Sequence, residues 1–239
     1  ALATLVRLTS PSKVSLLRQQ VDKYARSPLR HLFSTVMLNE TGAVVARQPL
    51  HSVSEAEHIE AVAKAQMYQD ATIYQRVRAE GLILPALKQI QYEHRIRIGD
   101  VLRIVEHSPF VPVGRELIYA QGLHAGLESD FITSTHLLIP QLEHSMRMIL
   151  EEKGVATSKH DRKGQQNEFD LNTTLYMTEI KDVLGEDTVF DLQGVLVAHF
   201  GSNLRNRSAH GLMEYGEFYS SAAVYLWWLT WRLCLIPLL

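Results

Sequence analysis

The spacing of apolar residues along the chain predicts a mainly α-helical protein. In the N-terminal half, apolar positions recur every three or four residues in 11–25, in a long region opened by Ser54, and in 98–106. We expect Gly81 and Pro85 to interrupt the long region, so that a separate helix follows and ends near His94. Each of these helices is expected to bury one apolar face.

One pair of short segments has a different pattern. Residues 33–38 and 43–47 flank the sequence Asn39-Glu40-Thr41-Gly42, whose composition is typical of a turn. This arrangement predicts a short β-hairpin within an otherwise helical N-terminal region.

The C-terminal half predicts a four- to five-helix bundle. Helical spacing is expected over 115–127, 132–153, 189–200 and from Leu204 to about Leu235. The connector Phe110-Val111-Pro112 favours a boundary between an N-terminal accessory region, 1–110, and a helical core, 111–239.

Polar residues dominate 154–172, which predicts a mobile loop between two core helices. Its basic side chains could contact a substrate, or the loop could be a solvated insertion; they are Lys159, His160, Arg162 and Lys163.

The second predicted core helix carries a charged pair beside an apolar stripe. Glu143 and Arg147 are four residues apart, whereas the stripe consists of Leu138, Leu142, Met146 and Ile149. The pair is either an ordinary ion pair or a pair that faces a functional site and orients its residues.

Composition sets broad limits on the protein. The chain has 239 residues, 46% of them hydrophobic, so it can bury a sizeable core. A single cysteine, Cys234, excludes an internal disulfide and fits a reducing cytoplasm. The formal net charge of −2 argues against a general nucleic-acid binder but not against a local cationic site. The missing initiator Met and the apolar end at Leu239 suggest a fragment or a processed chain.

The end of the chain is unusually apolar. Residues 222–239 contain Trp227, Trp228 and Trp231 and approach the length of a membrane span. Because Arg232 lies within this segment, we expect a buried or dimer-forming helix rather than a membrane helix. A membrane-associated protein would require these three rings to face outward.

Residues 201–211, with the sequence GSNLRNRSAHG, combine a phosphate-binding group with an acid/base group. Gly201 can end one helix, and Ser202 or Asn203 can cap the next. Arg205 then lies in the first helical turn, where an anion is favoured, and Asn206 and His210 share a face.

This Arg-Asn-x-x-x-His-Gly string resembles the RNase motif of the HEPN superfamily (higher eukaryotes and prokaryotes nucleotide-binding domains). It is most similar to a bacterial branch related to the endoplasmic-reticulum membrane-associated RNA degradation protein. Two more segments resemble that branch, Gly114-Arg115-Glu116-Leu117 with Gly122-Leu123, and 137–143 with Arg147. The resemblance covers roughly the C-terminal half.

The resemblance implies a metal-independent endoribonuclease without a cofactor, active as a homodimer. RNA cleavage would proceed by attack of the 2′-OH on the adjacent phosphorus and leave a 2′,3′-cyclic phosphate. His210 would act as general acid or base, and Arg205 would bind the phosphate oxygens. Asn206 would orient His210 or bind a phosphate oxygen, Arg207 would add a phosphate contact, and Glu143 and Arg147 are secondary candidates.

Three other interpretations stay open. The same pocket could bind RNA, a nucleotide or a protein partner without cleaving it, because many HEPN-like domains are thought to do so. An antitoxin-like protein could restrain the enzyme. A membrane-associated interaction domain is the weakest alternative. The histidines do not have zinc-site spacing, although His136 and His144 lie two helical turns apart and His94 and His124 precede them.

Overall fold

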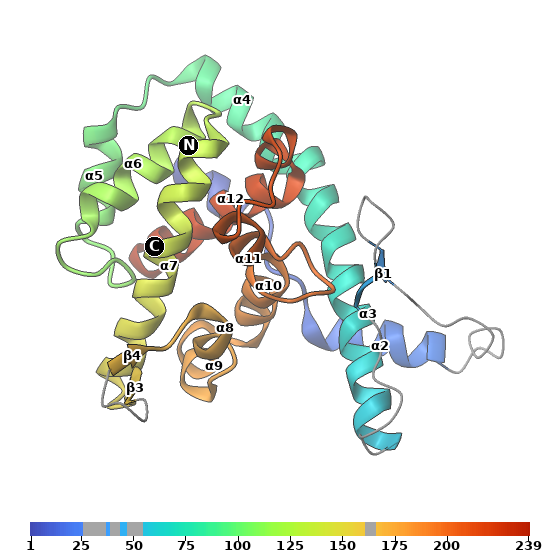
Figure 1. Cartoon of the computed structure of the whole chain (residues 1–239). Coiled ribbons are helices and arrows are strands. Elements are labelled where there is room, and N and C mark those ends of the chain that lie inside the picture. Colours follow the sequence, from blue (N-terminus) through green and yellow to red (C-terminus); the bar gives the residue numbers. More distant parts are fainter. Residues whose placement is uncertain (26–36, 39–43, 47–54, 161–165) are drawn as a thin grey trace.

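The computed structural model describes residues 1–25, 37–38, 44–46, 55–160 and 166–239. These residues form a mainly α-helical fold in which helices pack around one another without a central sheet (Figure 1). The N-terminal elements are α1 (Leu2–Arg7), α2 (Val14–Ala25), α3 (Glu55–Arg78), the π-helical segment η2 (Ala79–Ile83), α4 (Leu84–Glu93) and α5 (Ile98–Val105).

The C-terminal elements run from Glu116 to the 3₁₀ segment at the end of the chain. They are α6 (Glu116–Leu127), α7 (Phe131–Glu152), α8 (Leu171–Thr174), α9 (Thr178–Leu184), α10 (Glu186–Leu196), α11 (Leu204–Ala209), the 3₁₀ segment η3 (Tyr215–Tyr219), α12 (Ser221–Leu235) and η4 (Ile236–Leu238). The expected helices at α2, α3, α5, α6 and α7 are therefore confirmed, whereas α1, α8 and α9 were not predicted.

The expected interruption near Gly81 and Pro85 is a π-helical segment rather than a break: η2 contains Gly81, and the separate helix α4 follows it and ends at Glu93, next to the expected His94. The backbone stays helical from α3 through η2 into α4, and Figure 1 shows one long rod that changes direction along its length. Pro85 lies at the start of α4, where a missing N–H costs little, and the π-helical turn before it absorbs the change in hydrogen bonding.

The predicted N-terminal hairpin is confirmed for its described strands. β1 (Met37–Leu38) pairs antiparallel with β2 (Val44–Ala46); the turn between them lies outside the described residues. A second pair was missed: β3 (Ser158–His160) pairs antiparallel with β4 (Gln166–Glu168) inside the segment expected to be a loop.

The last predicted core helix, from Leu204 to Leu235, is wrong as a single element. The chain forms the short α11, turns at Gly211 with a φ of 65°, passes through η3 and only then enters α12. A positive φ is unfavourable for residues with a Cβ, so glycine suits this turn. The helix before it also ends early, at Leu196 rather than Phe200.

A close backbone approach explains Gly201, which follows α10. A Cβ at this position would lie 2.0 Å from the carbonyl oxygen of Gly194. That same oxygen accepts a hydrogen bond from the Ser202 N–H at 2.8 Å. The absence of a side chain at Gly201 therefore lets the chain fold back on α10 before α11 begins.

Helix α12 lies at the centre of the fold and is almost wholly buried. Trp227 donates its indole N–H to the carbonyl oxygen of Leu123 at 2.9 Å, and Trp228 donates to that of Leu5 at 2.9 Å. By length and apolar character alone, Ser221–Leu238 could cross a membrane, but 67% of it is buried against the rest of the chain. The indole rings face the interior, not outward as a membrane-associated protein would require.

Residues on both sides of the expected boundary at 110–111 belong to one hydrophobic core. Leu5, Ile83 and Leu87 from the N-terminal part join Leu142 and Trp231 in the same buried cluster. This continuity favours one folded unit for the part of the chain that the structure describes.

A buried carboxylate ties several elements to α10. Asp191 accepts hydrogen bonds from the Ser12 N–H at 2.9 Å, from the Gln75 side chain on α3 at 3.0 Å and from the Tyr225 hydroxyl on α12 at 2.6 Å. Burial raises the pKa of Asp191, because the low-dielectric interior disfavours the charge more than these donors favour it.

Candidate functional site

The short helix α11 presents the Arg-Asn-x-x-x-His string at the surface. Asn203 precedes it in a left-handed conformation, with a φ of 51°. Its side chain does not cap the backbone but accepts a hydrogen bond from the Asn206 amide at 2.7 Å. Arg205 lies in the first helical turn, as expected.

Arg205 is half-buried and held against α7. Its guanidinium Nη2 lies 3.3 Å from Oε2 of Glu143, and its Nη1 donates to Asn206 Oδ1 at 3.1 Å. The structure thus brings Arg205 and Glu143 together although they are 62 residues apart in sequence. The guanidinium is fixed by its partners before any ligand is present.

Glu143 is shared by two arginines. Its other carboxylate oxygen accepts a hydrogen bond from Arg147 at 3.0 Å, and Arg147 also donates to the carbonyl oxygen of Phe169 at 3.2 Å. Both members of the predicted i,i+4 pair are about one-fifth exposed. The pair is therefore largely shielded from solvent, and its carboxylate faces Arg205.

Two polar residues of this cluster were missed by sequence analysis. Asn172 exchanges hydrogen bonds with the Asn206 amide at 3.2 Å in both directions, and Asp170 accepts one from Asn172 at 3.2 Å. Burial opposes ionisation of Asp170, but bonds from Thr173 and Asn172 and the nearby Arg205 charge outweigh it and lower its pKa. No spacing rule links these two missed residues to α11, because Asp170 caps the separate helix α8 and Asn172 lies in its first turn, so only the tertiary fold brings them there.

His210 ends α11 and is exposed. Its backbone N–H bonds to the carbonyl oxygen of Asn206 at 3.1 Å, but its imidazole makes no hydrogen bond to any residue that the structure describes. Asn206 makes no hydrogen bond to the His210 imidazole among the described residues; its amide bonds to Asn172, Asn203 and Arg205.

Arg207 contacts a different element from Arg205. Its guanidinium forms an ion pair with Glu217 on η3, and the second carboxylate oxygen of Glu217 accepts from the Glu214 N–H at 2.8 Å. Arg207 therefore fixes the turn after α11, and its charge is neutralised there rather than added to the Arg205 cluster.

The other polar candidates do not assemble into a site. Among the described residues, no group of three His, Cys, Asp or Glu side chains could hold a metal ion. The Nε2 of His124 lies 3.1 Å from the Ile96 carbonyl oxygen, and His136 stacks on Phe218 with ring centroids 4.9 Å apart. The side chains of the basic loop residues lie outside the described part; they are Lys159, His160, Arg162 and Lys163.

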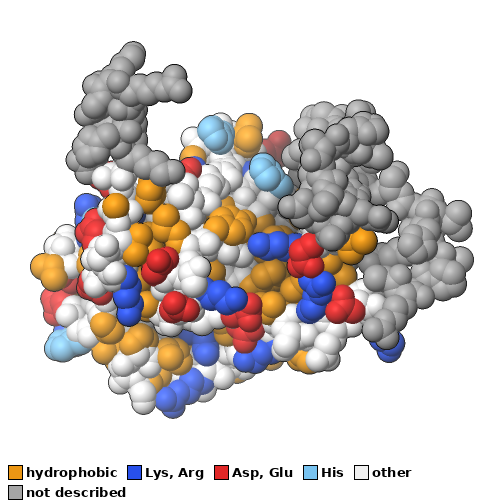
Figure 2. Space-filling model, turned by 90° about the horizontal axis from the view of Figure 1, so that it is seen from below, with side chains coloured by type: hydrophobic (Ala, Val, Ile, Leu, Met, Phe, Trp, Pro, Cys, Tyr) orange, Lys and Arg blue, Asp and Glu red, His pale blue; other side chains and the backbone are white. Residues whose placement is uncertain are grey.

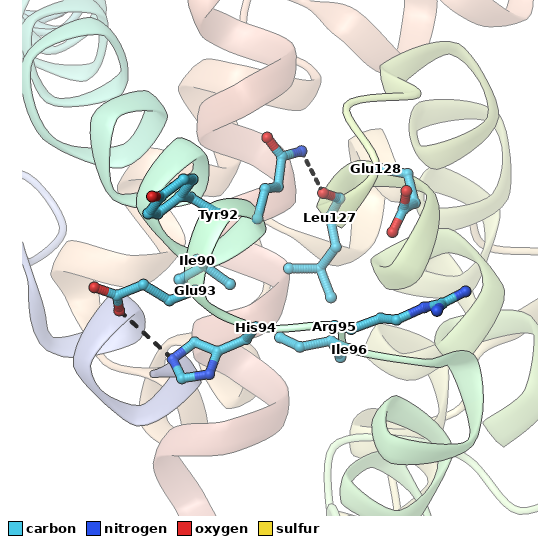
Figure 3. A pocket seen from close by; sticks show the side chains of 9 residues that line it. Ile90, Tyr92, Glu93, His94, Arg95, Ile96, Leu127 and Glu128 are labelled. Carbon is cyan, nitrogen blue, oxygen red and sulfur yellow. Dashed lines mark hydrogen bonds and ion pairs between the residues drawn. The ribbon is translucent and has the colours of Figure 1, made fainter.

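A separate hollow of about 540 Å³ lies where α4 leads into α5 (Figure 3). Residues 90–96 line it together with Leu127 and Glu128 from the end of α6. Gln91 donates to the Leu127 carbonyl oxygen at 2.6 Å across it. None of the residues in 201–211 lines this hollow, so it is distinct from the Arg205 cluster.

The molecular surface does not carry a broad basic field on the face seen in Figure 2. Lys and Arg side chains are interspersed there with Asp, Glu and apolar side chains. A cationic site on this face is therefore local, in keeping with the near-neutral composition.

Comparisons with known proteins add no relative. No family model, curated protein or solved structure matches this chain.

Proposed function

We propose that this chain is a HEPN-type, metal-independent endoribonuclease that acts as a homodimer. The observation that carries the proposal is the exposed imidazole of His210, which no described residue hydrogen-bonds, at the end of the helix whose first turn holds Arg205. An acid/base group must reach its substrate, and a phosphate-binding group must be held in place. These two residues meet those two requirements.

The chemistry follows from the residue types. The RNA 2′-oxygen forms a bond to the adjacent phosphorus, the bond from phosphorus to the 5′-oxygen breaks, and a 2′,3′-cyclic phosphate remains. One imidazole takes the proton from the 2′-OH, and a second protonates the leaving 5′-oxygen. A second copy of the chain would supply the second imidazole.

Arg205 has capacity left for a phosphate. Three of the five N–H donors of its guanidinium point to Glu143 and Asn206. The two remaining donors suit non-bridging phosphate oxygens, on which negative charge builds during the reaction. Glu143 and Asn206 would then act as positioning residues for Arg205.

The proposal is tested by kinetics on a single-stranded RNA of mixed sequence in EDTA. We expect His210→Ala and Arg205→Ala each to lower kcat/KM at least about 100-fold, the scale of lost acid/base or transition-state stabilisation. His107→Ala is the matched control, since His107 is also exposed and follows a helix end. Equal rates for His210→Ala and wild type would contradict the proposal.

A binding module without catalysis is the second candidate. The pairing of the half-buried Arg205 with Glu143 supports it, because holding a ligand requires a positioned arginine but no acid/base group beside it. In that case wild type cleaves no RNA, and ligand affinity falls more with Arg205→Ala than with His210→Ala.

A further inference from the structure

Arg115 stands apart from the other arginines of the described chain. It is half-buried, just before α6, yet its guanidinium makes no hydrogen bond and no ion pair with any residue that the structure describes. The other half-buried arginines of the described residues all have partners, whether a carboxylate, a hydroxyl or a carbonyl oxygen; they are Arg18, Arg78, Arg147, Arg205, Arg207 and Arg232. A partly desolvated cation without a partner is costly, so an anion bound there would stabilise it.

The packing of α6 on α7 sets the surroundings of Arg115. The Tyr119 hydroxyl bonds to the Ser145 hydroxyl at 2.7 Å, which fixes the register of the two helices. Arg115 lies one turn before Tyr119, and His144 is next to Ser145 in sequence. Burial, then Arg115 and then Arg147 lower the pKa of His144, while Glu151 acts in the opposite direction. Arg115 therefore lies close enough to α7 for its charge to act there.

Nearby carboxylates do not neutralise Arg115 by contact. Glu116 accepts from the Gly114 N–H at 3.0 Å, and Glu151 is exposed and accepts from the Thr157 hydroxyl at 2.9 Å. Both carboxylate oxygens of Glu143 already accept hydrogen bonds, one from Arg147 and one from Arg205. The positive charge of Arg115 remains available to a ligand.

We propose that Arg115, with His144 beside it, binds a backbone phosphate of the same RNA strand whose cleaved linkage lies at Arg205 and His210. This inference rests on the proposed function. This binding mode requires Arg115, Arg147 and Arg205 to form a row; Arg147 lies one turn after His144 on α7 and shares Glu143 with Arg205. A strand that carries a phosphate at each nucleotide can contact both ends of this row, and the planar guanidinium matches phosphate oxygens.

The test measures binding apart from cleavage. A 2′-O-methyl oligonucleotide lacks the attacking hydroxyl, so its Kd is measured by fluorescence anisotropy at several salt concentrations. We expect Arg115→Gln to raise Kd about tenfold and to reduce the slope of log Kd against log salt by about 1, as for one lost phosphate contact. Arg95→Gln is the matched control, since Arg95 is exposed and unbonded near the hollow of Figure 3.

The other outcomes overturn either this inference or the proposed function. An unchanged Kd and slope for Arg115→Gln would do so, as would no binding of the oligonucleotide to wild type. Competition by polyglutamate as strong as by the oligonucleotide would indicate an acidic protein partner instead. Binding that depends on Arg115 without any RNA cleavage would refute the proposed catalysis alone, whereas cleavage with Arg115-independent binding would refute this inference alone. Circular dichroism of each variant verifies the fold.

Discussion

At the scale of single residues, Glu143 holds two guanidinium groups with one carboxylate. Glu143→Gln removes the charge that Arg147 and Arg205 share in a site about one-fifth exposed. We expect the free energy of unfolding to fall by about 2 kcal/mol, because two partly desolvated cations lose their counter-ion. Urea denaturation measures this change.

A matched variant lies on the same helix. Glu152 ends α7, is exposed and forms no ion pair with the described residues, so Glu152→Gln should change stability by less than about 0.5 kcal/mol. Equal effects of the two variants would show that the shared carboxylate contributes nothing specific.

The candidate site could be predicted from the sequence only in part. Arg205 and His210 are near neighbours, so their common location followed from local spacing, and Glu143 was a candidate because of its helical pairing with Arg147. Asp170 and Asn172 could not be predicted, because they belong to the start of α8, where Asn172 is 34 residues before Asn206, and only the tertiary fold brings α8 to α11. The neutralisation of Arg207 by Glu217 depends on the turn into η3, which no periodic pattern indicates.

At the scale of secondary-structure elements, the turn between α10 and α11 depends on Gly201. Gly201→Ala would place a Cβ against the backbone carbonyl of Gly194, which cannot rotate away. We expect a loss of about 2 kcal/mol in unfolding free energy and a lower Tm, as for other overpacked sites. Gly216→Ala is the control, because its Cβ meets no atom within 4 Å. A Gly201→Ala protein as stable as this control would contradict the close approach.

Asp191 joins α10 to α3, α12 and Ser12. Asp191→Ala leaves the donors of Ser12, Gln75 and Tyr225 unsatisfied in the interior, and we expect about 3 kcal/mol of lost stability by urea denaturation. Asp182→Ala, at an exposed residue of α9, should change stability by less than about 0.5 kcal/mol. A comparable effect of both variants would contradict this role.

The raised pKa of Asp191 makes the free energy of unfolding depend on pH. The folded state holds its proton more tightly than the unfolded state, whose carboxyl pKa is about 3.9. The stabilisation that protonation of Asp191 gives the folded state is therefore fully present below the unfolded-state pKa. It is lost as pH rises through the raised pKa of the folded state. Asp191→Asn should reduce this loss of unfolding free energy with rising pH, which urea denaturation at several pH values measures. An unchanged pH dependence in the variant would contradict the role of Asp191.

The elements differ in how well their apolar patterns predicted them. The stripe Leu138, Leu142 and Met146 predicted α7, including its passage through Pro140. Helix α12 is apolar on every side, so its sequence predicted a helix but neither which face it buries nor where it begins. The break at α11 depends on glycine conformation and on the approach to Gly194, which are tertiary features.

At the scale of the whole molecule, one core extends across both halves of the chain. Trp228 bonds to the Leu5 carbonyl oxygen, and Arg232 bonds to that of Val6 at 2.7 Å. We expect residues 111–239 alone to unfold without a cooperative urea transition, because α12 loses α1 and α3. All three tryptophans lie on α12, so their fluorescence reports this loss directly. A cooperative transition with buried-type emission would instead support an independent core at 111–239.

The central claim is that His210 performs metal-independent RNA cleavage. The most direct measurement is analysis of the product ends after RNA is incubated in EDTA with wild type and with His210→Ala. The account predicts 2′,3′-cyclic phosphate ends from wild type and their loss in the variant. Uncut RNA with a verified wild-type dimer, or cyclic ends that persist in His210→Ala, would contradict it.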